Sequence, residues 1–322
     1  MAFSDRLISW HARHGRRGLP WQGTRDPYRI WLSEVMLQQT QVSAVIPYYE
    51  RFLKRFPSVE VLARADQGEV LELWSGLGYY ARGRNLHAAA KQIALQGFPQ
   101  RTEEIAELPG VGRSTAAAIA AFAFGERAAI LDGNVKRVLA RHYGIADTKR
   151  FWPLAERLLP ERGIETYTQA LMDLGATVCL RRNPHCEACP VARSCVAKRK
   201  GLIGELPAPR SRKALPLKKA TWFLLVNKGK ILMQRRPASG LWGGLLTFPE
   251  TAIRDCEIAS RRKLPVIEHG FTHFRLRAQP ILCEVGKIDS RRNLLWIALG
   301  AAAAGAVPAP VRTLLRSLPA AR

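Results

Sequence analysis

The apolar positions in the first two thirds of the chain recur at helical spacing. From residue 1 to about 198, apolar side chains fall three and four residues apart, interrupted by loop signals at residues 23–27, 56–58 and 97–99 that contain Gly, Pro or Asp. This part has no run of alternating apolar and polar residues that would predict a strand. The pattern therefore predicts a nearly all-α domain over residues 1–198.

The pattern changes to strands after a basic stretch. Residues 199–219 are polar, rich in Lys and Arg and interrupted by Pro, which predicts an interdomain linker. The segments 221–226 and 230–235 read as two strands of a hairpin joined through Asn227, Lys228 and Gly229. We expect further strands at 245–248, 274–285 and 294–298, a loop at 301–304 and a short helix at 311–318. Residues 220–322 are thus predicted to form an α+β domain.

Length and charge narrow the class of protein. A chain of 322 residues is long enough for two domains. Fifty Lys and Arg against 26 Asp and Glu give a formal charge of +24, which favours a polyanionic partner, nucleic acid before an anionic membrane. No stretch approaches the ~20 apolar residues of a spanning helix, and residues 1–10 lack the pattern of a signal peptide. We expect a cytosolic protein that contacts no membrane.

Four of the six cysteines form one compact array. Cys179, Cys186, Cys189 and Cys195 stand in a C-x6-C-x2-C-x5-C spacing, which predicts thiolate ligation of a metal in a reducing compartment. Ligand type alone leaves zinc and an iron–sulfur cluster equally open. The surrounding basic residues, which would suit phosphates, are Arg181, Arg182, Arg193, Lys198 and Arg199. The two remaining cysteines, Cys256 and Cys283, are read as buried small apolar residues.

A glycine-containing turn joins two helical patterns at residues 108–112. Gly110 and Gly112 let main-chain N–H groups approach a phosphate at the start of the next helix, which begins around Arg113, Ser114 and Thr115. The segment predicts a helix-hairpin-helix that holds a DNA backbone. The alternative is an ordinary tight turn between helices with tolerated glycines.

The hairpin, residues 130–138 (ILDGNVKRV) and the cysteine array, in this order, resemble the endonuclease III superfamily of DNA glycosylases. Residues 19–21 (LPW), 31–41 (WLSEVMLQQTQ) and 76–82 (GLGYYAR) narrow the resemblance to the MutY-type adenine glycosylases. The resemblance covers nearly all of residues 5–249 and resumes at 271–274. It implies a mostly helical glycosylase domain with a [4Fe-4S] loop at 179–195 and a Nudix-like C-terminal domain that recognises 8-oxoguanine.

Two carboxyl groups carry the chemistry that the resemblance implies. Glu34 has Ile30, Trp31 and Leu37 on its own helix face, and such an apolar setting favours a protonated acid that can donate to a leaving base. Alone, the pattern equally allows an acid that reaches solvent at the edge of the stripe. Asp132 would by itself be read as a helix cap without chemistry. The resemblance instead makes Asp132 the carboxylate that stabilises an oxocarbenium-like transition state, with Asn134 beside the sugar.

The resemblance also implies the groups that hold the DNA. The substrate would be adenine opposite 8-oxoguanine or guanine in double-stranded DNA, flipped out of the helix and bound by a monomer at the nucleoid of a bacterial cytosol. The intercalating residues would be Gln39 and Tyr79. The remaining residues implied to contact base or backbone are Trp21, Leu37, Gly110, Gly112, Ser114 and Gln169, and for 8-oxoguanine Phe271, Thr272 and His273.

Three rival classes of protein each differ from an adenine glycosylase in one feature of the sequence. A bifunctional lyase needs a Lys where Ser114 stands. A noncatalytic DNA-binding protein has no need of both Glu34 and Asp132. A Nudix hydrolase of free nucleotides needs a Glu-rich metal-binding helix, which the sequence lacks although residues 240–249 resemble the entry to that fold. Only 21 residues separate Pro249 from Phe271, so we expect a helix of the C-terminal domain to be trimmed there.

Overall fold

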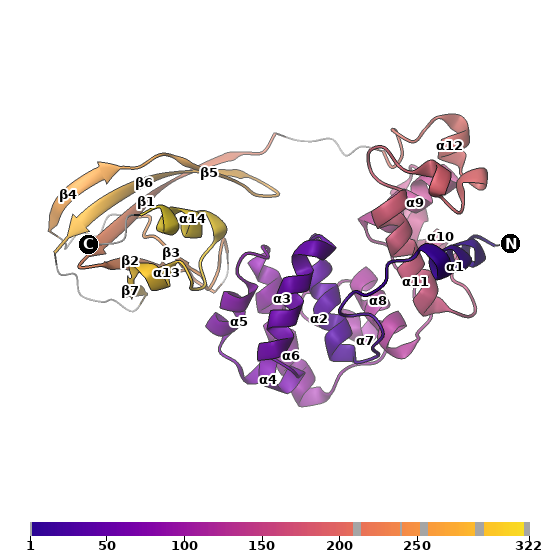
Figure 1. The fold of residues 1–322 in the computed structure, drawn as a ribbon, viewed down its shortest axis with the longest axis horizontal. Helices are drawn as coiled ribbons and strands as arrows, with labels where there is room; N and C mark the ends of the chain where they lie inside the picture. The colour runs from indigo at the N-terminus through magenta and orange to yellow at the C-terminus, as the bar shows by residue number, and fades with distance from the viewer. Residues whose placement is uncertain (1, 209–213, 239, 252–256, 287–292, 319–322) are drawn as a thin grey trace. The chain divides into compact units, whose positions relative to one another are not determined.

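The computed structural model describes residues 2–208, 214–238, 240–251, 257–286 and 293–318 (Figure 1). The α-helices are α1 (Phe3–His14), α2 (Pro27–Leu37), α3 (Val42–Arg55), α4 (Val59–Arg64), α5 (Gln67–Trp74), α6 (Tyr80–Gln96), α7 (Thr102–Ala106), α8 (Arg113–Phe124), α9 (Gly133–Tyr143), α10 (Phe151–Arg157), α11 (Ile164–Asp173), α12 (Val196–Lys200), α13 (Leu299–Ala302) and α14 (Ala309–Ser317). The strands are β1 (Leu217–Asn227), β2 (Lys230–Arg235), β3 (Leu246–Thr247), β4 (Ile258–Lys263), β5 (Ile267–Gly270), β6 (Arg275–Val285) and β7 (Leu294–Ala298).

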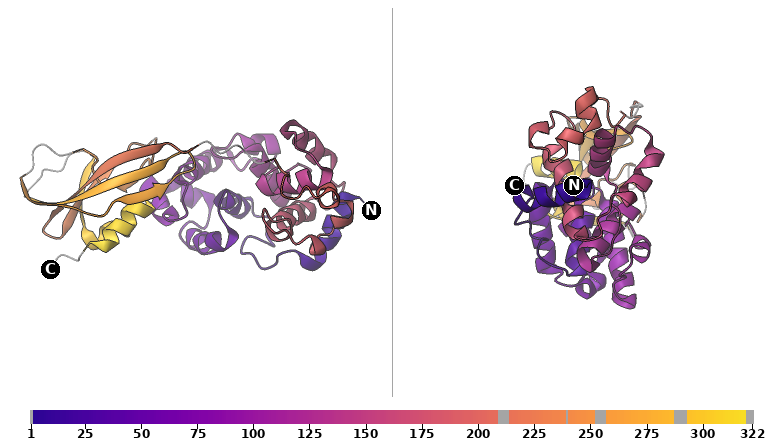
Figure 2. Two further views of the ribbon diagram at one scale, coloured as in Figure 1. Left: turned by 90° about the horizontal axis from the view of Figure 1, so that it is seen from above. Right: turned by 90° about the vertical axis from the view of Figure 1, so that its right-hand side faces the viewer.

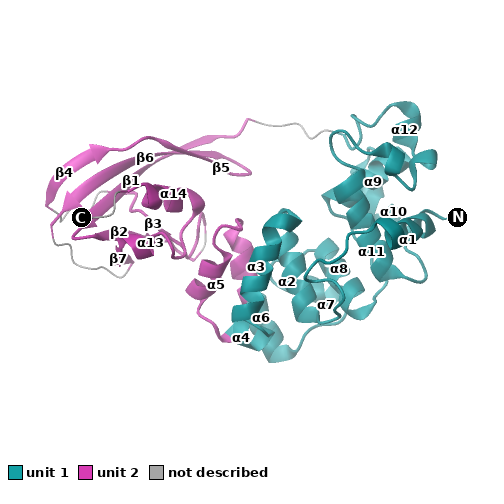
Figure 3. Cartoon of the chain, viewed as in Figure 1, with its two compact units in different colours: residues 1–63, 88–211 teal, residues 64–87, 212–322 magenta. Residues whose placement is uncertain are grey.

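The chain folds into two compact units (Figure 3). Unit 1 contains residues 1–63 and 88–211, and unit 2 contains residues 64–87 and 212–322. The described part of unit 1 is helical, as the spacing of its apolar residues predicts. Unit 2 combines a sheet with helices, so the predicted fold class, mostly α in the first part and α+β in the second, is confirmed. Residues 64–87, which the sequence assigned to the helical domain, belong to unit 2.

The core of unit 1 lies between helices from distant parts of the sequence. Helix α1 packs on α11, and α8 packs on both α2 and α7. Helix α8 suits this central place because its Ala-rich sequence presents small buried side chains around most of its circumference, from Ala116 to Ala121. Helix α11 runs directly into a π-helix, Leu174–Val178, which ends at Cys179.

The predicted helix-hairpin-helix is present as α7, a turn and α8. Gly110 has a φ of +79°, a left-handed conformation that glycine adopts without steric cost, and Gly112 is the N-cap of α8. The side chain of Gln38, at the end of α2, donates from Nε2 to the main-chain oxygen of Gly110 at 3.2 Å. The turn is therefore fixed to the helix that carries Glu34.

The sheet of unit 2 has the strand order β3-β2-β1-β6-β4, with β7 beside β2 and β5 beside β6 (Figure 1). Strands β1 and β2 form the predicted hairpin around Lys228 and Gly229, and the long pairing of β1 with β6 is parallel. Helix α14, expected over 311–318, lies beside the sheet (Figure 2) and buries Val311, Leu314 and Leu315. An α+β domain is thereby built from the predicted strand segments together with α14.

Two details differ from the sequence-based expectations. Strands β4 and β5 occupy part of the segment between Pro249 and Phe271, for which no strand was predicted. Residues 301–304 are not wholly a loop, because α13 includes Ala301 and Ala302 and the latter is buried against the domain. Within the predicted linker, residues 209–213 lie outside the described residues, and so does Cys256.

Residues 64–87 pack on the C-terminal part of unit 2 through a buried polar cluster. The Ser75 hydroxyl donates to the main-chain oxygen of Val307 at 2.9 Å, and the Tyr80 hydroxyl donates to the same oxygen at 3.2 Å. Arg312 of α14 donates from Nη2 to Ser75 Oγ at 2.5 Å and to Gly305 O at 3.0 Å. Both sides of this contact belong to unit 2.

Candidate active site and DNA-binding groups

A cavity of about 640 Å³ in unit 1 contains Glu34 in its wall. Helix α2 begins where the Asp26 side chain accepts a hydrogen bond from the Tyr28 N–H at 2.9 Å, with Pro27 in the first helical position. Two turns later Glu34 reaches the cavity. The wall also includes Trp21, Ile30, Ser33, Phe122, Glu165 and Gln169.

The surroundings of Glu34 favour the protonated, uncharged form of its carboxyl group. Ile30 and Trp31 on the same helix face are buried, as predicted. Burial is the largest cause that raises the pKa of Glu34, and the negative charge of Asp132 is the second; together they raise it to about 7. A carboxyl group with this pKa is substantially protonated at neutral pH and can act as a general acid.

Asp132 is the N-cap of α9. Its Oδ1 accepts a hydrogen bond from the Val135 N–H at 2.7 Å, so the capping role that the sequence suggested is real. One residue earlier, the N–H of Leu131 donates to Ser114 Oγ at 2.8 Å. The first turn of α8 thus holds the segment that presents Asp132.

Arg137 connects Asn134 to the start of the cysteine array. Its Nη2 donates to Asn134 Oδ1 at 2.9 Å and to Gly175 O at 2.7 Å, and its Nε donates to Cys179 O at 2.7 Å. A Cβ on Gly175 would lie 2.6 Å from Asn134 Cβ, so the close approach of α9 and the π-helix requires glycine there.

The four cysteines of the array lie in one loop, and none of them forms a disulfide. Burial is the largest cause that raises the pKa of the Cys189 thiol to about 11, with the neighbouring cysteines contributing in the same direction. The side chain of Arg141 is buried beside them and donates to the main-chain oxygens of Leu180 at 2.6 Å and Arg181 at 3.1 Å. Within the described ranges, no group of three or more His, Cys, Asp or Glu is placed to hold a metal ion. The donor chemistry of four thiols suits iron or zinc.

The side chains around the array match the predicted basic surface. Arg181, Arg182, Arg193 and Arg199 are exposed, and Lys198 pairs with Glu187 at 3.1 Å. The partly buried Arg137 and the buried Arg141 were not singled out from the sequence, where they are two of many basic residues. Cys283 is buried, as expected.

Gln39 and Tyr79 share an unusual backbone conformation. Their φ angles are +56° and +49°, in the left-handed region that side chains other than glycine rarely adopt, and both are exposed, Tyr79 by 48%. Gln39 belongs to unit 1, directly after α2, whereas Tyr79 belongs to unit 2 between Gly78 and α6. Strained, exposed residues of this kind are frequent at functional sites.

The remaining predicted residues fall into two groups. Trp21 and Gln169 line the cavity, whereas Leu37 is partly buried outside its wall. Phe271, Thr272 and His273 form the turn between β5 and β6, closed by a hydrogen bond from Phe271 N–H to Phe274 O at 2.9 Å. The Phe271 ring stacks on Phe274 with centroids 4.4 Å apart, which leaves Thr272 and His273 exposed at the tip.

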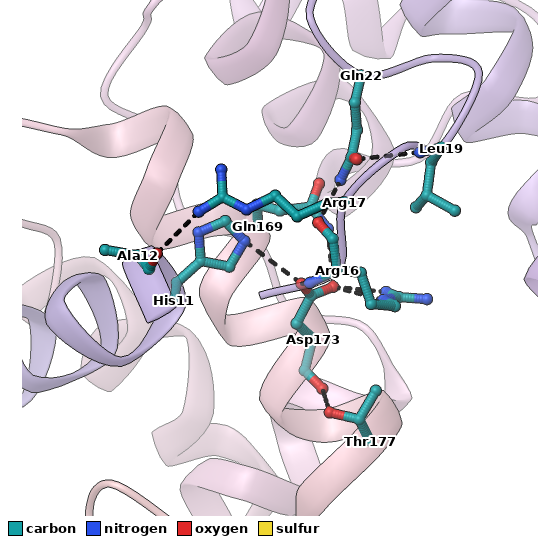
Figure 4. A network of polar contacts seen from close by, with 9 residues as sticks. All are labelled: His11, Ala12, Arg16, Arg17, Leu19, Gln22, Gln169, Asp173 and Thr177. Atoms are coloured by element: carbon teal, nitrogen blue, oxygen red, sulfur yellow. Dashed lines mark hydrogen bonds and ion pairs between the residues drawn. The ribbon is translucent and has the colours of Figure 1, made fainter. Parts of the chain in front are cut away.

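A polar network around Asp173, which the sequence did not indicate, includes residues that line the cavity (Figure 4). Its centre is the carboxylate of Asp173, which is contacted by Arg16, His11 and Gln169. His11 and Arg16 lie more than 150 positions before Asp173 in the sequence, whereas Gln169 lies one helical turn before it. No spacing of residues in the local sequence predicts such a network.

Comparison with known proteins identifies the family. The model of HhH-GPD superfamily base excision DNA repair proteins matches residues 32–159, and a NUDIX domain model matches residues 221–317. An adenine DNA glycosylase of Buchnera aphidicola subsp. Baizongia pistaciae is 35% identical over 341 residues, covering 99% of this chain and 97% of the relative. The chain belongs to the adenine DNA glycosylase family.

A further relative and one solved structure are also similar to this chain. The human adenine DNA glycosylase is 36% identical over 327 residues, covering 82% of this chain and 60% of the human protein. The solved structure of a thermostable thymine-DNA glycosylase is 30% identical, with a TM-score of 0.57 over 62% of this chain and 95% of its own. The chain is thus a DNA glycosylase of base excision repair, a hydrolase of N-glycosidic bonds. None of the helices in the described ranges combines the length and apolar character of a membrane span.

Proposed function

We propose that this adenine DNA glycosylase excises adenine mispaired with 8-oxoguanine or guanine in double-stranded DNA. The observation that carries the proposal is the protonatable Glu34 in the wall of a cavity large enough for a flipped base, within electrostatic reach of Asp132. Two carboxyl groups with opposite preferred charge states are a general way to combine acid catalysis with charge stabilisation. The two sequence relatives described above are both named adenine DNA glycosylases, which supports adenine as the base.

In the proposed reaction Glu34 donates its proton to the departing adenine. Asp132 is held by the start of α9 and faces the sugar as a carboxylate, which stabilises the positive charge that develops there. Asn134, fixed by Arg137, positions the sugar side. Water then attacks the sugar and gives up a proton to the Glu34 carboxylate, which restores the acid. Ser114 has no amine, so the enzyme is monofunctional and forms no imine with the opened sugar.

The remaining groups bind the DNA. Main-chain N–H groups around Gly110, Gly112 and Ser114 hold a backbone phosphate at the start of α8. Gln39 and Tyr79 fill the space that the flipped adenine leaves, for which their exposed, left-handed positions are suited. Trp21, Leu37 and Gln169 border the base. The protein acts as a monomer on the nucleoid, in the cytosol of a bacterium.

Cys179, Cys186, Cys189 and Cys195 would hold a [4Fe-4S] cluster. Four thiols without disulfide partners in one loop, packed against Arg141, are donors suited to iron. When bound, the cluster supplies structural order: it fixes a loop whose exposed arginines meet phosphates. The proposed excision uses no electron from it.

Thr272 and His273 would read 8-oxoguanine. Relative to guanine, this lesion adds an O8 acceptor and turns N7 into a donor, and the exposed tip of the β5–β6 turn presents a hydroxyl and an imidazole. Their contacts would add roughly 1–3 kcal/mol of discrimination each.

The test compares duplexes with adenine opposite 8-oxoguanine, guanine or thymine at one salt concentration, with hot alkali revealing abasic sites. We expect excision of adenine opposite 8-oxoguanine and guanine and almost none opposite thymine. The variant Thr272→Ala/His273→Ala should keep excision opposite guanine and lose the preference for 8-oxoguanine. Equal excision opposite all three bases by the wild type would refute the proposal.

A further inference from the structure

The carboxylate of Asp173 contacts three residues that line the cavity, namely Arg16, His11 and Gln169. Its side chain is buried, at 1% exposure, near the end of α11. Arg16 contacts Oδ1 with Nε and Nη2, both at 2.7 Å, and donates its main-chain N–H to Oδ2 at 2.8 Å. His11 Nε2 lies 3.3 Å from Oδ2 (Figure 4). The position of this carboxylate is therefore fixed from two sides.

Asp173 determines how the amide of Gln169 is oriented. Gln169 Nε2 donates to Asp173 Oδ1 at 2.8 Å. A carboxylate paired with arginine only accepts hydrogen bonds, so the NH₂ group of Gln169, and not its oxygen, must face Asp173. The carbonyl oxygen Oε1 consequently points away from Asp173, on a partly exposed side chain that lines the same cavity as Glu34.

We propose that Asp173 is a specificity-determining positioning residue that locks Gln169 with its hydrogen-bond acceptor toward the bound base. Adenine carries an exocyclic amine, which donates, where hypoxanthine and guanine carry a carbonyl oxygen, which accepts. An amide free to rotate by half a turn would satisfy either base. The locked amide favours the amine and leaves two acceptors opposed when the base is hypoxanthine. This inference rests on the proposed excision of adenine.

A purely structural Asp173 would tie the loop after α1 to α11 and leave base preference untouched. The two roles separate when single-turnover excision is measured on duplexes that present adenine, hypoxanthine or unsubstituted purine opposite the same guanine. Asp173→Asn lets the amide of Gln169 adopt both orientations, because the new side chain both donates and accepts. We expect the ratio of adenine to hypoxanthine excision to fall on the order of tenfold.

Two further variants keep the test decisive. Gln169→Leu removes the amide itself, so it should lower the same ratio, and Asp173→Asn should lower it no further in that background. Thr177→Val removes the hydroxyl that donates to the main-chain oxygen of Asp173 at 2.8 Å, so it should change stability alone and keep the wild-type ratio. Thermal melts of each variant report on folding.

The outcomes are distinct. A folded Asp173→Asn protein with lower rates and an unchanged ratio would overturn the inference, and so would a wild-type ratio in Gln169→Leu, even if Asp173→Asn fails to fold. Wild-type protein that excises no adenine at all would instead overturn the proposed function. The duplex with adenine opposite guanine shows this outcome directly.

Discussion

The Oδ1 atom of Asp132 accepts a hydrogen bond from the main-chain N–H of Val135 at 2.7 Å. One carboxylate thus caps a helix and, in the proposed mechanism, stabilises the transition state. The two roles respond differently to substitution, because asparagine caps a helix as well as aspartate but carries no charge.

Asp132→Asn should therefore lower the single-turnover rate of adenine excision by about 100-fold or more, with an unchanged melting temperature. Asp132→Ala should lose the rate and also about 1 kcal/mol of stability, since the Val135 N–H loses its acceptor. Calorimetric melts and abasic-site assays measure the two effects separately. Normal excision by the asparagine variant would leave Asp132 with the capping role alone.

Glu34 should make excision depend on pH. Because burial first and Asp132 second raise its pKa to about 7, the acid form is present below pH 7 and is lost as the pH rises above it. The single-turnover rate should fall by about tenfold per pH unit well above 7. Glu34→Gln should abolish excision at every pH while duplex binding persists, which gel-shift titration at fixed salt can verify.

The same carboxyl group should affect stability with a predictable sign. Its folded pKa lies above the value of 4.5 expected in the unfolded chain, so the folded protein holds the proton more tightly. The free energy of unfolding that Glu34 contributes is therefore highest below about pH 4.5 and declines as the pH rises to about 7. Denaturant titrations across this interval should show a shallower decline for Glu34→Gln, and identical slopes would contradict the raised pKa.

Cys186→Ser should remove one ligand of the proposed cluster. Iron content, visible absorption and affinity for duplex DNA should all fall, because the loop with the exposed arginines loses its order. Cys283→Ser, at a buried cysteine of unit 2 outside the array, is the matched control and should keep the iron. Stoichiometric zinc without iron in the wild type would refute the cluster assignment.

Arg312→Ala should destabilise unit 2. The substitution removes the partly buried guanidinium that donates to Ser75 Oγ and Gly305 O, which costs about 1–3 kcal/mol. Limited proteolysis should then cut within residues 64–87 sooner than in the wild type. Arg316→Ala, at an exposed arginine of the same helix, should leave the cleavage pattern unchanged.

The sequence predicts the elements that have a clear period and misses those that lack one. The hairpin of β1 and β2 was expected because two segments of strand-forming residues flank a turn that contains asparagine and glycine. Strand β4 is exposed along its whole length, so its sequence (IASRRK) shows no buried face, and it forms only because it can pair with β6. Residues 301–304 were misread because a run of alanines has no amphipathic pattern that would predict the short helix α13.

The candidate site shows the same division. Glu34 was proposed from its apolar neighbours together with a family resemblance. Asp132 was proposed from the resemblance alone, since its local sequence indicated a helix cap. The ion pair of Arg16 with Asp173 spans 157 positions and arises only when α1 and α11 pack together. Tertiary contacts of this kind leave no periodic trace in one sequence.

The packing of residues 64–87 on the C-terminal part of unit 2 has a consequence for protein engineering. These residues carry Tyr79, yet they are anchored by Val307 and Arg312. A chimera that receives the last hundred residues of a relative would therefore inherit a foreign anchor for its own Tyr79 segment. For the grafted domain to recognise the lesion in its new chain, it must carry compatible partners for Ser75 and Tyr80. We therefore expect residues 64–87 and the C-terminal part of unit 2 to be inherited together.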